Sequence, residues 1–285
     1  MGYIKWNIDP VIFDTGVLSP HYYSLFFALG FILSYRVLHQ VFMREKVSEE
    51  LLSKLSVYVI AATLIGARLG HCLFYEANYY LAHPLEIILP FSWTDGKFRI
   101  TGIHGLASHG GAIGILAGLL FYVHKYKISL LWLLDRLSIV IPLCGACIRI
   151  GNFFNSEIIG KPSSMPWAVI FERVDQVPRH PAQLYEAFCY LGLFLLFRYI
   201  FRKYYKQLRP GQLFGYFIIS LFSIRFLIEF LKENQEDFEH YLPFNMGQLL
   251  SIPFIICGVY LIFRRQEVKI MPSNNSHEYT SNNSR

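Results

Sequence analysis

Charged residues are scarce in this 285-residue chain. Asp, Glu, Lys and Arg make up 16% of it, whereas a soluble domain of this length carries about a quarter. Apolar types reach 54%, aromatics reach 17% and the mean hydropathy is +0.36. The composition therefore excludes an ordinary soluble domain and indicates that lipid solvates most of the chain.

The positive charge is not concentrated in one region. The net charge is +6, but the basic residues form no basic arm and no zinc-finger motif is present, so no nucleic-acid partner is expected. In a membrane protein, a basic excess is typical of orientation signals and of contact with anionic lipid.

Cysteine is also sparse, and its pattern predicts no disulfide framework. The five cysteines all lie in apolar segments. Cys144 and Cys147 form a C-G-A-C sequence that resembles a redox pair, but their spacing beside Gly and Ala favours close helix packing. The N-terminus lacks the basic-then-apolar order of a cleavable signal, so we expect the first span to lead insertion.

Long apolar segments dominate what is present. Since a bilayer core requires about 20 apolar residues of helix, the sequence predicts an all-α polytopic membrane protein with about seven transmembrane helices. The expected spans are residues 20–42, 55–75, 105–124, 129–149, 182–201, 211–231 and 247–264.

Flanking Lys and Arg residues predict the orientation. Fourteen lie on one set of flanks and seven on the other, which places the N-terminus outside and the C-terminus in the cytoplasm. Residues 1–271 would form the membrane domain and 272–285 a disordered cytoplasmic tail. Residues 150–181, between the fourth and fifth spans, are expected to form a small external capping insert with a short strand from Trp167 to Phe171.

Ionisable residues inside predicted spans are costly and indicate a cavity, a partner or a polar substrate. Arg68 is as consistent with packing as with function, and Arg136, beside Asp135, is better explained by structure. Arg225 and Glu229, at i and i+4, could form a local ion pair. The full set of costly residues is Arg68, His109, Arg149, Arg225 and Glu229.

A phosphate is the ligand that best fits this set. Each guanidinium can donate two parallel hydrogen bonds to a phosphate, and the obvious phosphate in a membrane is a phospholipid head group. Composition and spacing do not name a reaction. A transporter or scramblase that binds phospholipid without chemistry would also explain buried arginines, and a structural membrane subunit would explain the helices alone.

Several longer motifs occur in a fixed order along almost the whole chain. The sequence thereby resembles bacterial phosphatidylglycerol–prolipoprotein diacylglyceryl transferases, and the block from Arg149 to Gly160 is the most diagnostic match. The motifs are IDPVIFDTG, HYYSLFFALGF, GARLGHCLFY, SHGGAIG, RIGNFFNSEIIGKP, RHPAQLYEA, RFLIEF and MGQLLSIP.

The resemblance implies a reaction, two substrates and a location. The family moves the diacylglyceryl group of phosphatidylglycerol onto the lipobox cysteine of a prelipoprotein signal peptide, which forms a thioether and releases glycerol phosphate. This alkyl transfer at carbon needs no oxyanion hole, and no cofactor or metal is expected because the arginines supply the positive charge. The implied location is the bacterial cytoplasmic (inner) membrane.

The resemblance also implies roles for particular residues. His109 would be the base that accepts the thiol proton, and Arg149 and Arg225 would stabilise the charge that grows on the phosphate. Glu229 would position Arg225. The substrate-binding residues implied are Tyr23, Gly110, Gly111, Asn152, Asn155, Glu157, Gly160 and Glu229.

Three positions depart from the family pattern. Leu221 stands where many members have Tyr, so a hydroxyl near Arg225 would be missing or supplied elsewhere. Ser156 stands where Gly is frequent and Lys161 where Arg is frequent, and both of these changes are mild.

Overall fold

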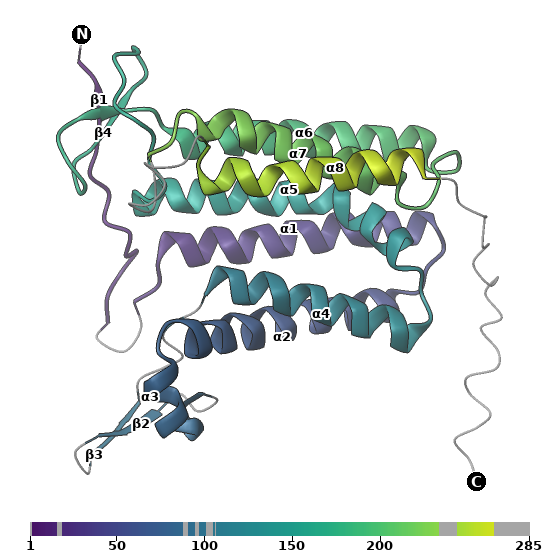
Figure 1. Cartoon of the computed structure of the whole chain (residues 1–285), viewed down its shortest axis with the longest axis horizontal. Coiled ribbons are helices and arrows are strands. Elements are labelled where there is room, and N and C mark those ends of the chain that lie inside the picture. Colours follow the sequence, from purple (N-terminus) through teal and green to yellow (C-terminus); the bar gives the residue numbers. More distant parts are fainter. Residues whose placement is uncertain are drawn as a thin grey trace.

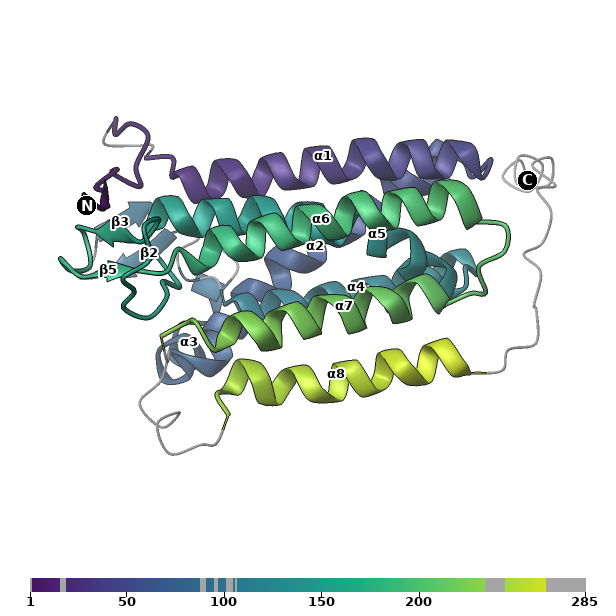
Figure 2. The same cartoon turned by 90° about the horizontal axis from the view of Figure 1, so that it is seen from above.

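Seven long helices run side by side in the computed structural model, which describes residues 2–15, 19–87, 91–94, 97–100, 105, 107–233 and 244–264 (Figures 1 and 2). Their positions match the seven expected spans, so the prediction of an all-α polytopic membrane protein is confirmed. The helices are α1 (Tyr22–Arg44), α2 (Glu49–Phe74), α4 (Ser108–Tyr126), α5 (Leu130–Asn155), α6 (Ala182–Tyr204), α7 (Gln212–Glu229) and α8 (Met246–Phe263).

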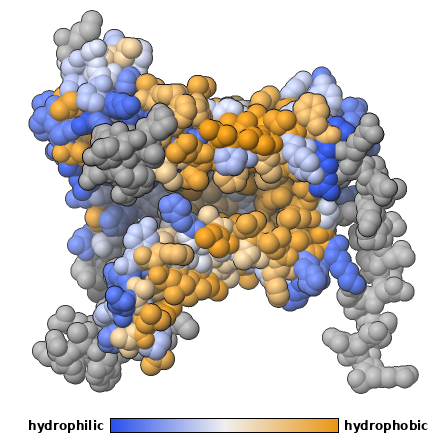
Figure 3. Space-filling view, viewed as in Figure 1, coloured by the Kyte–Doolittle hydropathy of each residue, from blue (hydrophilic) through white to orange (hydrophobic). Residues whose placement is uncertain are grey.

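Six of the seven are long and apolar enough to cross a membrane by length and composition, as judged on the described residues. The exception is α4 (Ser108–Tyr126), which also lines up with an expected span. Large apolar side chains remain exposed along the helices, among them Leu64 and Ile65 of α2. Figure 3 shows these hydrophobic surfaces along the middle of the bundle, with hydrophilic surfaces toward its two ends. Lipid would cover this apolar surface.

Polar side chains define where several helices begin. The Ser48 hydroxyl accepts a hydrogen bond from the Leu51 amide at the start of α2. A reciprocal capping box joins Asn245 and Gln248 at the start of α8. Such caps satisfy amides that have no partner within the helix, and each contributes about 1 kcal/mol.

Helix α5 is the central element of the bundle. More of its apolar window is buried than that of the other candidate spans, and α1 and α6 both pack along it. At Gly30 of α1, an added Cβ would lie 3.2 Å from Cys144 Sγ and 3.2 Å from Cys147 Cβ. Both thiols are free, so the interpretation of C-G-A-C as a packing motif is confirmed.

Glycines bring α2 and α4 together as a second unit, which lies beside the other helices in Figure 1. A Cβ added to Gly110 would lie 2.3 Å from the Gly66 carbonyl oxygen, and one added to Gly114 would lie 2.2 Å from the Ala62 carbonyl oxygen. No side chain fits at either position, so the two backbones are in direct contact.

A small sheet covers one end of the bundle, here named the capped end. Strand β4 (Val169–Phe171) lies within the predicted strand, and it pairs with β5 (Pro178–Arg179) and in parallel with β1 (Ile4–Trp6). The pairing with the N-terminal segment was not predicted, because it joins residues far apart in the sequence. The insert is shorter than expected, since α5 continues to Asn155.

A second small segment follows α2 at the same end (Figure 1). It contains α3 (Ala77–Ala82), the 3-10 helix η1 (Pro84–Ile87), β2 (Phe91–Thr94) and β3 (Lys97–Ile100). The predicted cytoplasmic tail, 272–285, lies outside the described residues. The opposite end of the bundle, where α1, α6 and α8 end, is here named the far end.

Candidate active site

Arg149 lies in the last two turns of α5, near the capped end. Its Nε is 2.7 Å from Glu186 Oε2, on α6. Its Nη1 donates a hydrogen bond of 3.2 Å to Asn152 Oδ1, one turn further along α5. The helix thus continues past the predicted end of the span at residue 149, and the guanidinium is fixed by a charged and a neutral partner.

Glu186 connects Arg149 to a second buried cation, Lys232. The Lys232 ammonium donates to Glu186 Oε1 at 2.9 Å and to Glu229 Oε2 at 3.1 Å. Glu186 is 0% exposed and Lys232 is 1% exposed, so this four-residue network is shielded from solvent. Burial strengthens the electrostatic attraction within each ion pair. Removal of one charged partner would therefore lower the free energy of unfolding substantially.

Sequence reasoning missed both Glu186 and Lys232. Glu186 lies inside an expected span, so the rule that singled out five other costly ionisable residues also applies to it. Lys232 was counted among the outer flanking charges, because it follows the last predicted residue of its span. Only the three-dimensional structure shows that it turns back between α6 and α7.

The Glu157 carboxylate binds the side-chain amides of two asparagines within the block from Arg149 to Gly160. It accepts hydrogen bonds from Asn152 Nδ2 at 3.0 Å and from Asn155 Nδ2 at 3.1 Å. Gln183 Nε2 also donates to the Glu157 carbonyl oxygen. The chain can turn back because Ser156 adopts a left-handed conformation, with φ 56° and ψ 37°, at the end of α5. The structure therefore brings Arg149, Asn152, Asn155 and Glu157 together.

Tyr23 joins this group from α1. A Cβ added at Gly151 would lie 3.1 Å from Tyr23 Cα, so the tyrosine backbone packs directly on α5. The charges of Glu157 and Arg149 both act on the Tyr23 hydroxyl. These contacts place Tyr23 beside the Arg149 end of α5.

Arg225 lies on α7, and its charge acts on the hydroxyl of Tyr190 on α6. The Tyr190 hydroxyl lies within electrostatic range of both Arg149 and Arg225 and donates a long hydrogen bond of 3.5 Å to Glu186 Oε1. Leu221 packs against the apolar core instead. The Tyr190 hydroxyl bonds Glu186 rather than Arg225, so no contact among the described residues replaces the hydroxyl that a tyrosine at 221 would bring.

The local ion pair that the spacing of Arg225 and Glu229 allows does not form. Both residues are described, and no ion pair joins them. Glu229 pairs with Lys232 instead, and its carboxylate lies so close to Gly247 that a Cβ there would be 2.6 Å from the carboxyl carbon. The start of α8 therefore packs directly on the Glu229 carboxylate.

Gly160 lies where three backbone segments cross. It donates its amide to the His180 carbonyl at 3.0 Å, and an added Cβ would lie 2.5 Å from that oxygen and 2.8 Å from the Leu231 carbonyl oxygen. Gly160, which the resemblance implies as a substrate-binding residue, thus makes close backbone contacts within its own chain. It joins the insert to the segment that carries Lys232.

His109 and its glycines occupy the α2–α4 unit. His109 is exposed in the first turn of α4, at the capped end (Figure 1). Gly110 and Gly111 pack against α2. No hydrogen bond or ion pair joins His109 to Arg149, Arg225 or Glu157. Figure 3 shows a recess between the α2–α4 unit and the helices above it.

The remaining intramembrane arginines have structural partners. Arg68 donates to the backbone carbonyls of Ile87, at 3.0 Å, and Glu86, at 2.6 Å. Arg136 pairs through two nitrogens with Glu45, so its structural role is as predicted. Its main partner is not the neighbouring Asp135, because that carboxylate accepts the backbone amides of Gly211 and Phe214.

Comparison with known proteins decides the family. The family model described as prolipoprotein diacylglyceryl transferase matches residues 10–264. The chain belongs to the prolipoprotein diacylglyceryl transferase family.

Relatives of this transferase family cover nearly the whole chain. A phosphatidylglycerol–prolipoprotein diacylglyceryl transferase of Chloroherpeton thalassium is 47% identical over 266 residues, which is 92% of this chain and 94% of the relative. The protein of that name from Bacteroides fragilis is 45% identical over 261 residues, covering 91% and 94%. That from Tolumonas auensis is 42% identical over 258 residues, covering 90% and 95%.

Proposed function

We propose that this protein transfers the diacylglyceryl group of phosphatidylglycerol to the lipobox cysteine of prelipoprotein signal peptides. The family match and the names of the three relatives support this reaction. The observation that carries the assignment of the site is the ion pair of the half-buried Arg149 with the buried Glu186, which fixes a guanidinium beside Asn152 and Glu157 at the capped end.

In this proposal Arg149 and Arg225 bind the phosphodiester of the lipid. The cysteine thiolate attacks the glyceryl carbon that carries the phosphate oxygen, so a carbon–sulfur bond forms as the carbon–oxygen bond breaks. The phosphate leaves as a glycerol phosphate with one more negative charge. Donors that bind this charge more tightly in the transition state than in the ground state lower the barrier.

The residues around the arginines would hold them and orient the head group. Glu186 fixes Arg149 through its Nε atom. Other N–H donors of the planar Arg149 guanidinium then remain for a ligand. Asn152, Asn155 and Glu157 form a hydrogen-bonded polar group that would contact the head group. Tyr23 would contact it from α1. Gly160, Gly110 and Gly111 would act by close packing that positions these elements.

His109 would accept the thiol proton. A thiol with an ordinary pKa of about 8.5 is mostly protonated at neutral pH, so a histidine base raises the thiolate fraction at the moment of attack. His109 lies exposed at the capped end, where a signal-peptide cysteine could reach it from the recess beside α4.

The protein would lie in the inner membrane with the capped end outside. The far end carries many basic residues, including Arg44, Lys127, Arg202 and Arg209, which fits a cytoplasmic face. Cysteines introduced at Ser163 and at Lys206 would test this in intact cells. An impermeant maleimide should label the first and not the second, and the reverse pattern would overturn the orientation.

The reaction itself is tested with purified protein, phosphatidylglycerol and a synthetic lipobox peptide. The peptide should gain the mass of one diacylglyceryl group on its cysteine, with equimolar release of glycerol phosphate. A peptide with Ser in place of that cysteine is the matched control. Movement of lipid between leaflets without the adduct would favour the scramblase alternative and contradict the proposal.

A further inference from the structure

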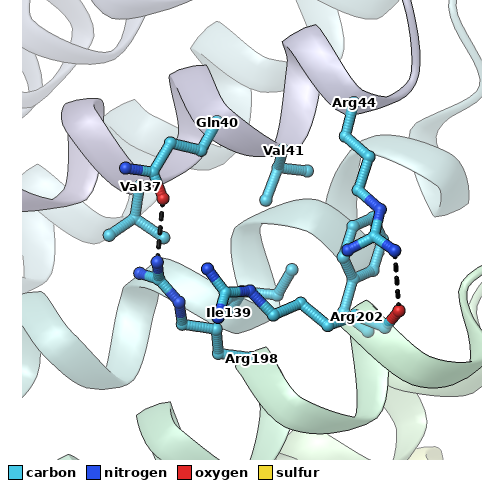
Figure 4. A pocket seen from close by; sticks show the side chains of 8 residues that line it. Val37, Gln40, Val41, Arg44, Ile139, Arg198 and Arg202 are labelled. Carbon is cyan, nitrogen blue, oxygen red and sulfur yellow. Dashed lines mark hydrogen bonds between the residues drawn. The ribbon is translucent and has the colours of Figure 1, made fainter.

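Three arginines line a pocket at the far end, with Arg44 on the opposite side from Arg198 (Figure 4). Arg44 extends from α1, and Arg198 and Arg202 extend from successive turns of α6. The apolar walls are Val37 and Val41 of α1, Ile139 of α5 and Phe201 of α6. Arg198 is half-buried at this pocket, whereas Arg44 and Arg202 are exposed.

The hydrogen-bond partners of these arginines are neutral. Arg198 Nη2 donates to Gln40 Oε1 at 2.8 Å, and Arg44 Nη2 donates to the Arg202 carbonyl oxygen at 2.9 Å. Arg44 also lies over the Tyr205 ring, 4.9 Å from its centroid. No carboxylate lines the pocket, so the three positive charges are not balanced there by the described part of the chain.

Carboxylates at this end are engaged elsewhere. Glu45 pairs with Arg136, Glu49 with His39 and Glu50 with Lys54. By contrast, Arg136 faces Glu45, and Arg179 faces Asp175 and Glu233. Clustered cations without a counter-charge repel one another, so an anionic ligand that occupies the pocket would stabilise the protein.

The surroundings of the pocket favour a lipid over a soluble anion. Helices α1 and α6 both pack on α5 but make few contacts with each other. Both expose large apolar side chains, such as Ile32 on α1 and Leu195 on α6. The arginines lie at the ends of these spans, at the depth where lipid phosphates meet water.

We propose that this pocket binds the phosphate of an anionic phospholipid from the leaflet at the far end, with its acyl chains along α1 and α6. Two or three guanidinium groups match the oxygens of one phosphate. The pocket is separate from the candidate active site, since Ile139 and Arg149 are ten residues or roughly 15 Å apart along α5. A lipid there would hold together the three helices that carry Tyr23, Arg149 and Glu186.

The test measures the melting temperature of the full chain in non-ionic detergent with added phosphatidylserine, phosphatidylcholine or inorganic phosphate. Phosphatidylserine is anionic but lacks the head group of the proposed substrate. It should raise the melting temperature, whereas phosphatidylcholine and phosphate should not. The double variant Arg198→Gln/Arg202→Gln should need at least tenfold more phosphatidylserine for the same rise.

The control variant Lys203→Gln/Lys206→Gln removes two charges from the same end but outside the pocket, and it should respond like the unmodified chain. If the arginine double variant does not fold, Arg44→Gln is measured in its place, with the same expected loss. An undiminished response in the pocket variants would overturn the site. An equal rise with inorganic phosphate would overturn the lipid assignment. Neither result depends on whether the protein transfers diacylglyceryl groups.

Discussion

The Arg149 Nε atom lies 2.7 Å from Glu186 Oε2, so a guanidinium on α5 is fixed from α6. The same carboxylate binds Lys232, which in turn binds Glu229 at the end of α7. One buried acid thus sets the position of an arginine and ties three helices together. A guanidinium held this way needs little reorganisation when charge develops on a bound phosphate.

Glu186→Gln should strongly destabilise the protein and slow transfer. The amide keeps the shape of the carboxyl but leaves Arg149 and Lys232 facing a neutral group, and removing one partner of a buried ion pair costs about 3–5 kcal/mol. Thermal unfolding and the peptide mass assay measure the two effects. Glu172→Gln, which disrupts a pair of 3.7 Å with the exposed Lys5, is the control. Equal melting temperatures for the two variants would contradict this account of Glu186.

Ser156→Gly should stabilise the protein. Ser156 has a positive φ of 56°, and its buried hydroxyl has no hydrogen-bond partner among the described residues. A left-handed conformation costs a non-glycine residue about 1–2 kcal/mol, of which the greater flexibility of unfolded glycine cancels a part. A rise in melting temperature is expected. Ser156→Ala removes the hydroxyl but keeps the strained Cβ, so it separates the two contributions; a larger gain from Ala than from Gly would refute the strain argument.

The insert should lose stability in acid through Asp175. Hydrogen bonds from Arg179 hold the pKa of Asp175 below its ordinary value. A carboxyl whose folded pKa lies below its unfolded value, about 3.9, adds stability above that pH, and the contribution disappears as the pH falls through the folded pKa. Asp175→Asn should therefore melt lower than the unmodified chain at pH 7, and the gap should close below about pH 4.

Asp9→Asn, which removes an exposed carboxylate at the same end, is the control for that experiment. It should leave the pH dependence of melting unchanged. A gap between Asp175→Asn and the unmodified chain that stays constant from pH 7 to pH 3 would show that the pair with Arg179 is not the cause.

The helices could be predicted from sequence because each one is encoded locally. An apolar stretch of sufficient length, with Ser48 or Asn245 before it, is enough to define a span and its start. The contact between α5 and α1 at Cys144 was also foreseeable, because small residues at i and i+3 favour close packing.

The partners within the site could not be predicted in this way. Lys232 looks like a flanking charge in sequence, and its burial depends on how α6, α7 and the insert meet. The i, i+4 spacing of Arg225 and Glu229 allows an ion pair, but Glu229 pairs with Lys232 and packs against Gly247 instead. The pairing of β1 with β4 likewise depends on a contact across more than half the chain.

His109→Gln should reduce transfer at neutral pH by about 10²–10⁴-fold, the range typical of losing a general base. Part of the rate should return as the pH rises toward 9, because the peptide thiol then ionises without help. His124→Gln lies on the same helix at the far end and should show neither effect. Full activity of His109→Gln at pH 7 would remove the histidine from the mechanism.

The most direct test of the site is the transfer rate of Arg149→Lys at saturating phosphatidylglycerol, measured by the mass gain of the lipobox peptide. Lysine keeps the positive charge but loses the planar fork, so the rate should fall at least 100-fold while the melting temperature shows a folded protein. Arg173→Lys, an exposed arginine of the insert, should keep the unmodified rate. A rate for Arg149→Lys within about twofold of the unmodified enzyme would contradict its role as the phosphate-binding residue.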